Sequence, residues 1–97
     1  MATYIVLASF TEQGIRSVKD TTKRADAVKE TAKRFGVTVR DLYWTLGSYD
    51  IVGVFDAPDD ASMTALGLSI AGGGNVRTQT MRAFSGEEMG RIIGKLA

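Results

Sequence analysis

The chain has 97 residues, of which 44% are hydrophobic, and a formal net charge of +1, which argues against a dedicated nucleic-acid or membrane protein. It contains no Cys, which excludes disulfides and thiol chemistry, and no His, which removes the commonest general base and metal ligand near neutral pH. The chain has no apolar run long enough for a membrane span and no signal-peptide pattern, so we expect a cytoplasmic protein. It is expected to form one domain over residues 1–97, without a metal or cofactor.

The first strand is predicted over residues 3–10, which are rich in β-branched and aromatic side chains. Both of its faces are largely apolar, which is typical of a strand that is covered on both sides. Residues 11–14 are predicted to form a turn. Residues 15–20 are predicted to form a short helical turn, with Ile15 and Val18 packing inward.

A helix is predicted from about Thr22 to Phe35, with basic residues on the faces away from its apolar stripe. The stripe consists of Ala25, Val28, Ala32 and Phe35, spaced by three, four and three residues. Gly36 is predicted to end the helix in the left-handed conformation that glycine favours. Residues 16–40 contain eight bases and three acids, and this basic surface is interpreted as solvated or as a contact for an acidic partner.

A β-hairpin is predicted next, with one strand over Val37–Leu46 and the other over Asp50–Phe55. Gly47-Ser48 between them suits a two-residue type II′ turn, because glycine stands at its first position. The two strands are therefore expected to be antiparallel neighbours.

The second half repeats the pattern of a helix followed by a strand. Asp59 or Asp60 is predicted to cap a helix that extends to about Ile70. The glycines at 72–74 end this helix and do not resemble a phosphate loop, since such a loop precedes a helix. A polar strand is predicted over Asn75–Phe84. Ser85 and Glu88 form a capping box for a last helix with an apolar stripe of Met89, Ile92, Ile93 and Leu96.

The order β-α-β-β-α-β with a C-terminal helix predicts an α+β, ferredoxin-like fold with a four-stranded antiparallel sheet. Right-handed crossovers place both main helices on one face of that sheet. The strands are apolar on the other face too, so we expect a homodimer that packs sheet against sheet as an α+β barrel.

These segments resemble the GYD-domain family, named for a Gly-Tyr-Asp signature. The signature reads here as Gly47-Ser48-Tyr49-Asp50-Ile51-Val52, and further similar stretches extend over nearly the whole chain. They are residues 10–15, 39–46, 57–60 and 75–78. The resemblance implies a dimeric α+β barrel and, since the family has no settled biochemical function, no particular reaction.

Tyr49, Asp50 and Arg77 are the main candidates for a ligand-binding site. Structurally, Asp50 would bond backbone amides of the turn, Tyr49 would pack against a partner, and Arg77 would form an ion pair. Functionally, the Asp50 carboxylate would stand at the mouth of a cleft, and Arg77 would clamp an anion. Trp44 is interpreted as a packing residue or an aromatic wall for a flat ligand, and Gln13 as a weaker polar contact.

Three functions remain open on these residues. The first is a homo-oligomeric binding or regulatory module for a small anionic or aromatic metabolite. The second is a small cofactor-free enzyme, similar to an oxygenase or an isomerase, with Asp50 as general base, Tyr49 as donor and Arg77 holding an oxyanion. The third is a purely structural assembly protein, in which the polar signature sets the register between copies.

Overall fold

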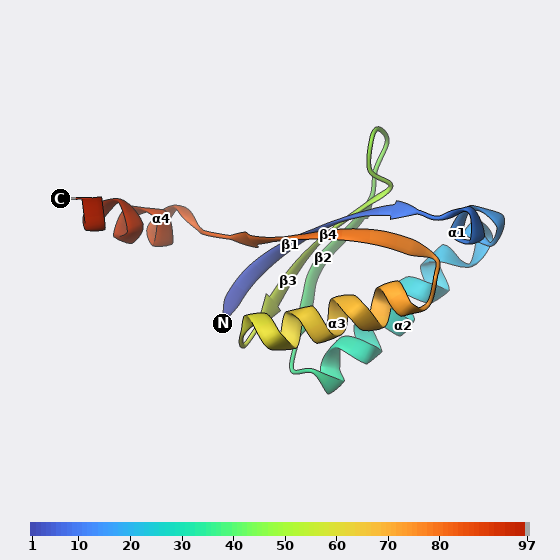
Figure 1. Ribbon diagram of the computed structural model, residues 1–97, viewed down its shortest axis with the longest axis horizontal. Helices are drawn as coiled ribbons and strands as arrows, with labels where there is room; N and C mark the ends of the chain where they lie inside the picture. The colour runs from blue at the N-terminus through green and yellow to red at the C-terminus, as the bar shows by residue number, and fades with distance from the viewer. Residues whose placement is uncertain (97) are drawn as a thin grey trace.

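The computed structural model describes residues 1–96, which form a four-stranded antiparallel sheet with the strand order β2-β3-β1-β4 (Figure 1). The strands are β1 (Ala2–Phe10), β2 (Thr38–Trp44), β3 (Ile51–Ala57) and β4 (Val76–Ala83). The α-helices are α1 (Glu12–Arg16), α2 (Thr21–Arg34), α3 (Asp60–Gly72) and α4 (Gly86–Ile93), with short 3-10 turns η1 (Val18–Asp20) and η2 (Gly94–Leu96). The predicted ferredoxin-like order with a C-terminal helix is confirmed. None of the helices within residues 1–96 is long and apolar enough to cross a membrane.

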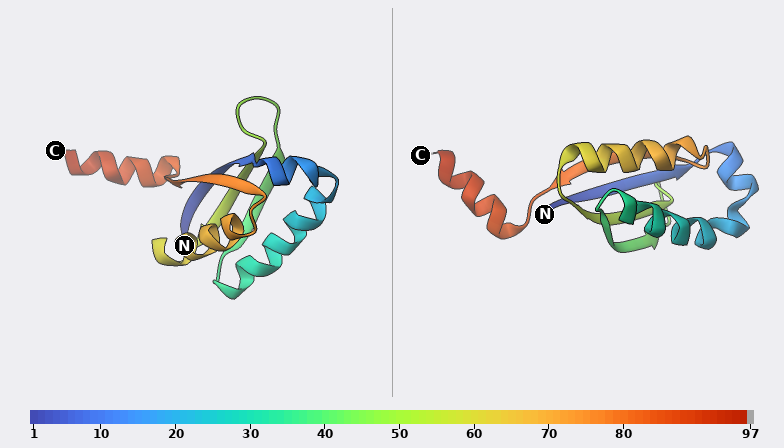
Figure 2. Two further views of the ribbon diagram at one scale, coloured as in Figure 1. Left: turned by 45° about the vertical axis from the view of Figure 1, so that its right-hand side comes forward. Right: turned by 90° about the horizontal axis from the view of Figure 1, so that it is seen from below.

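Helices α2 and α3 lie over the same face of the sheet (Figure 2). The core lies between these two layers, where the side chains of Phe55, Met63 and Leu66 are fully buried. Neighbouring residues of a strand point to opposite faces, so the alternate side chains lie on the face without helices. We call this surface the open face; its apolar residues are Ile5, Leu7, Tyr43, Val52, Val54 and Met81.

Helix α2 matches the sequence pattern that predicts it. Ala25 and Ala32 are buried, and Val28 and Phe35 pack against the core from partly buried positions. Gly36 follows the helix with a φ of 71°, which confirms the left-handed position predicted for it.

The segment after β1 is a correction to the predicted turn. Thr11 caps α1, because its hydroxyl oxygen accepts a hydrogen bond from the Gly14 backbone N–H at 3.1 Å. Threonine is a favoured N-cap residue, so the chain enters a helix at Glu12 instead of turning. Ile15 and Val18, predicted to pack inward, are exposed in this chain.

The two-residue turn predicted at Gly47-Ser48 is wrong. The β2–β3 ladder ends at the pair Trp44 and Ile51, and the Thr45 N–H donates to the Asp50 carbonyl oxygen at 2.8 Å. Residues 46–49 form a four-residue loop beyond this bond, and the loop projects from the sheet (Figure 1). The Thr45 hydroxyl closes the loop by donating to the Tyr49 carbonyl oxygen at 2.6 Å.

The second crossover begins with two acidic residues of different roles. Asp59 is the N-cap of α3, and its carboxylate accepts the Ser62 backbone N–H at 2.7 Å, which lowers the pKa of Asp59. Asp60 accepts a hydrogen bond from the phenol of Tyr4, and this bond is the main cause that raises the pKa of Tyr4. The bond fixes the start of α3 over the end of the sheet where β1 begins.

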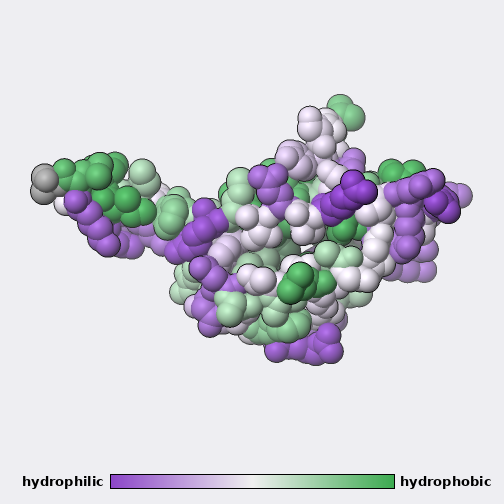
Figure 3. All heavy atoms as spheres, in the orientation of Figure 1, coloured by the Kyte–Doolittle hydropathy of each residue, from purple (hydrophilic) through white to green (hydrophobic). Residues whose placement is uncertain are grey.

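Helix α4 extends away from the sheet (Figure 1). The predicted capping box is confirmed: the Ser85 hydroxyl accepts the Glu88 N–H, and the Glu88 carboxylate accepts the Ser85 N–H. An ion pair of 3.6 Å joins Arg82 of β4 to Glu88. The apolar stripe of α4 is not buried within residues 1–96, and hydrophobic atoms lie at the surface along this helix and at the tip of the loop at 46–49 (Figure 3).

Candidate ligand-binding site

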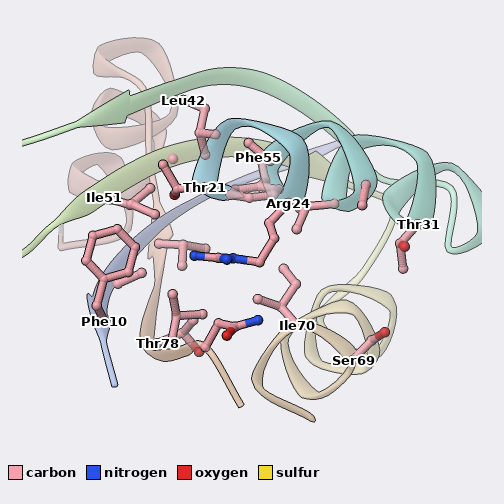
Figure 4. Close-up of a pocket in the computed structure, with 18 residues that line it drawn as sticks. Phe10, Thr21, Arg24, Thr31, Leu42, Ile51, Phe55, Ser69, Ile70 and Thr78 are labelled. Atoms are coloured by element: carbon pink, nitrogen blue, oxygen red, sulfur yellow. The ribbon is translucent and has the colours of Figure 1, made fainter. Parts of the chain in front are cut away.

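A cavity of about 230 Å³ lies between α2, α3 and the sheet (Figure 4). Small residues leave this space open, among them Ala8, Ala25 and Gly53. Gly53 has no room for a larger side chain, because a Cβ there would lie 2.6 Å from the Phe55 ring. The packing of Phe55 in the core therefore requires the glycine, and the glycine in turn helps to keep the cavity open.

Arg24 is the charged residue of the cavity lining. It shares one face of α2 with Thr21, Val28 and Thr31, at spacings of three and four residues, and all of them line the cavity. Figure 4 shows its side chain extending from α2 across the cavity, between Ile51 and Ile70. The guanidinium therefore enters a space whose walls are mainly apolar.

The hydrogen bonds of Arg24 go to uncharged groups. Its Nη1 donates to the Ser17 carbonyl oxygen at 2.8 Å and to the Ser17 hydroxyl at 3.1 Å. Its Nη2 makes a longer contact of 3.5 Å with the Gly14 carbonyl oxygen. None of the ion pairs within residues 1–96 includes Arg24. The positive charge is thus oriented by neutral acceptors and lacks a carboxylate partner in the described chain.

Asp50 joins the hairpin to the central strand. Its carboxylate accepts the Phe10 backbone N–H at 2.8 Å, and its own N–H donates to the Ala8 carbonyl oxygen at 2.9 Å. These contacts favour the structural interpretation of Asp50, although the amide that it binds belongs to β1 and not to the turn. The same bond holds the backbone of Phe10, whose side chain forms part of the cavity wall.

Replacing Asp50 with alanine is expected to lower the free energy of unfolding by about 1–3 kcal/mol, because the half-buried Phe10 N–H loses its acceptor. Asp50→Asn retains a side-chain oxygen and is expected to lose less than about 1 kcal/mol. Urea unfolding followed by circular dichroism measures both. An Asp50→Ala protein as stable as the wild type would contradict this role.

Tyr49 and Arg77 lie toward the open face, away from the cavity. The Tyr49 phenol and the Gln79 side-chain oxygen are 3.1 Å apart, so Tyr49 reaches across β1 to β4. Arg77 is two residues before Gln79 and therefore on the same face, opposite Ser9. Arg77 is in none of the ion pairs within residues 1–96, so the described chain does not join it to Asp50.

Trp44 and Gln13 occupy two further places. The Trp44 indole N–H donates to the Thr21 hydroxyl at 3.0 Å, which ties β2 to the start of α2. The Gln13 side-chain amide donates to the Gly73 carbonyl oxygen and to the Asn75 side chain, each at 3.1 Å. The five residues proposed from the sequence are thus spread over separate regions and do not converge on one site.

The cavity and Arg24 are the features that the sequence interpretation missed. The helix pattern predicts that the basic residues of α2 lie on faces away from its apolar stripe. A signal was nevertheless present, because Arg24 precedes Val28 by four residues and so lies beside the apolar stripe. The cavity itself depends on how two helices pack on the sheet, and a single helix pattern does not contain that information.

The comparisons with known proteins agree with the fold. The protein-family model of the GYD domain matches residues 4–93 of this chain. A Thermus thermophilus protein, named glutamine synthetase and cystathionine beta-lyase binding protein, is 37% identical over 85 residues, which cover 87% of this chain and 90% of the relative.

Two solved structures are similar in fold. The crystal structure of TTHA0845 from Thermus thermophilus has a TM-score of 0.57 and 24% identity, covering 88% of this chain and 95% of the other. The crystal structure of FFRP-DM1 has a TM-score of 0.60 and 20% identity, covering 87% of this chain and 100% of the other. At these identities the two structures bear on the fold alone.

Proposed function

The chain belongs to the GYD-domain family, and on this premise we propose that it is a cytoplasmic, homo-oligomeric regulatory module that binds a small anionic or aromatic metabolite. The main observation in support of the proposal is the open face of the sheet, which favours the homo-oligomer. The cavity under α2 and α3 supports the ligand part, since small-molecule sites are concave and mainly apolar with a few polar groups.

The open face has a continuous apolar centre. Leu7 is paired with Val52 on one side, and Ile5 lies between Val54 and Met81. A domain of this size buries only a limited fraction of its surface on folding, and covering such a face with a second copy removes more apolar area from water. The projecting α4 and loop 46–49 add exposed apolar side chains that a partner subunit would cover.

Leu7→Lys tests the homo-oligomer. We expect the wild-type protein to sediment with at least twice the 10.4 kDa chain mass. The Leu7→Lys variant should sediment as a monomer, because each copy would have to bury an unpaired ammonium group at the interface. Sedimentation velocity over a range of concentrations measures the mass, and circular dichroism verifies the fold.

Leu68→Lys is the matched control for this experiment. Leu68 lies on α3, on the other side of the molecule from the open face, and is 70% exposed. This variant should keep the wild-type mass. A wild-type protein that stays monomeric at every concentration would contradict the proposed assembly.

A second candidate function is docking on metabolic enzymes. It is favoured by the 37% identity to a relative whose name states that it binds glutamine synthetase and cystathionine β-lyase. Without Arg24, which enters the cavity, residues 16–40 have seven bases and three acids, and this net charge of +4 would supply a basic contact surface for such a partner. The test is surface plasmon resonance against both enzymes from the same organism. Binding that weakens as the salt concentration is raised supports docking through this surface. A chain that binds neither enzyme contradicts the docking function.

A further inference from the structure

We propose that the cavity between α2 and α3 is the ligand site of this module, and that it takes a small monocarboxylic acid with an aromatic or branched apolar body. The carboxylate pairs with the Arg24 guanidinium, and the apolar body fills the space over the sheet. This inference rests on the proposed function and adds the location of the site and the chemical class of its ligand.

The size of the cavity restricts the ligand. Sites for drug-sized molecules have volumes of about 300–1,000 Å³, and this cavity of about 230 Å³ is smaller. It therefore suits a single ring with a short side chain and excludes a nucleotide. The walls formed by Phe10, Ile51 and Ile70 supply the apolar contacts for such a ring.

The environment of Arg24 indicates the charge of the ligand. A guanidinium has five N–H donors, and the contacts to Ser17 and Gly14 leave donors free for a further acceptor. These neutral acceptors orient the group without compensating its charge. A carboxylate accepts two parallel hydrogen bonds from a guanidinium, and partial burial strengthens that pair.

The walls also exclude a second ionised group on the ligand. Arg24 is the charged side chain of the lining, and the residues opposite it are apolar or carry hydroxyl or amide groups. A free amino acid or a dicarboxylate would place another charge in the cavity without a partner, which is costly. The arrangement thus favours acids with one charge at one end.

The experiment uses phenylacetate as the probe and phenylacetamide as its neutral analogue. We expect phenylacetate to bind the 97-residue chain in isothermal titration calorimetry and to shift the amide resonances of Phe10, Val28 and Ile70 in NMR spectra. Phenylacetamide, and phenylacetate with Arg24→Met, should each bind at least tenfold more weakly, because the charge-assisted pair is lost. Arg34→Met removes an exposed arginine from the same helix and should leave binding unchanged.

A second variant tests whether the ligand needs the volume of the cavity, and it leaves the charge of Arg24 in place. Ala25→Leu adds side-chain volume at a buried position of the lining, so it should also weaken phenylacetate binding at least tenfold. Circular dichroism confirms the fold of each variant. If phenylacetate binds Arg24→Met and Ala25→Leu as tightly as the wild type, the cavity is not the site, while the proposed module still stands. If phenylacetamide binds as tightly as phenylacetate, the ligand class is wrong.

Discussion

Replacing Leu66 with alanine is expected to lower the free energy of unfolding by about 2–5 kcal/mol. Leu66 is fully buried on the inner face of α3, where it packs in the core that contains Phe55 and Met63. The substitution removes apolar contacts and leaves a cavity that the surrounding sheet cannot fill. Since a domain of this kind is stable by only about 5–15 kcal/mol, urea unfolding should show a large shift of the midpoint.

The same helix contains a matched control. Leu68 is 70% exposed, so Leu68→Ala removes the same atoms from a position that has little contact with the core. The control should change the free energy of unfolding by less than about 0.5 kcal/mol, as is usual for surface positions. Both variants are compared at a concentration where the protein is monomeric. Equal decreases in the free energy of unfolding for Leu66→Ala and Leu68→Ala would show that Leu66 is not part of the core.

Gly14→Ala is the second substitution with a large expected effect, a loss of about 1–3 kcal/mol or more. A Cβ at this position would lie 2.0 Å from the Asn75 backbone oxygen. That oxygen accepts the Thr11 N–H at 3.0 Å, and the Thr11 hydroxyl donates to the Gly74 carbonyl oxygen at 2.6 Å. The obstacle is therefore backbone that is held in place, and α1 must separate from the loop before β4 to admit a methyl group.

Gly67→Ala is the control for this second prediction. Gly67 lies within α3, and a Cβ there would meet no atom within 4 Å. Because alanine has a higher helix propensity than glycine, this variant should be as stable as the wild type or up to about 1 kcal/mol more stable. Thermal and urea unfolding of the two variants measure the contrast. A stable Gly14→Ala protein would mean that the contact between α1 and Asn75 is looser than described.

The topology could be predicted from the sequence because each main element has a strong local pattern. The stripe on α2, the glycine after it and the capping box of α4 each depend on residues within one or two turns. The order of these elements then leaves few ways to connect the strands with right-handed crossovers. The central place of β1 between β3 and β4 follows from those rules and agrees with the structure.

The hairpin could not be predicted in detail because a distant strand determines its shape. Gly47-Ser48 suits a tight turn when β2 and β3 are considered alone. In the structure, however, the backbone and carboxylate of Asp50 are bonded to β1. The hairpin ladder therefore stops at Trp44 and Ile51, and the intervening residues form a wider loop.

The position of the cavity could not be predicted from the sequence. Arg77 is the arginine that the sequence pattern favours as an anion clamp, whereas Arg24 is the arginine that lines the cavity. Sequence patterns rank a basic residue on a helix as exposed, because most are. Only the packing of α2 and α3 against Ala8 and Gly53 shows that this one extends into a cavity.

The central position of β1 also has a consequence for folding during synthesis. This strand is made first, yet its two neighbours are made much later: Ala2 pairs with Ala57, and Thr3 pairs with Ala83. At a translation rate of about 5–20 residues per second, β1 waits for several seconds without its partners. We therefore expect β1 to stay unpaired until β3 has left the ribosome, and the sheet to be complete only after β4 has followed. The apolar segment at residues 4–8 is the part of the nascent chain that a chaperone would protect.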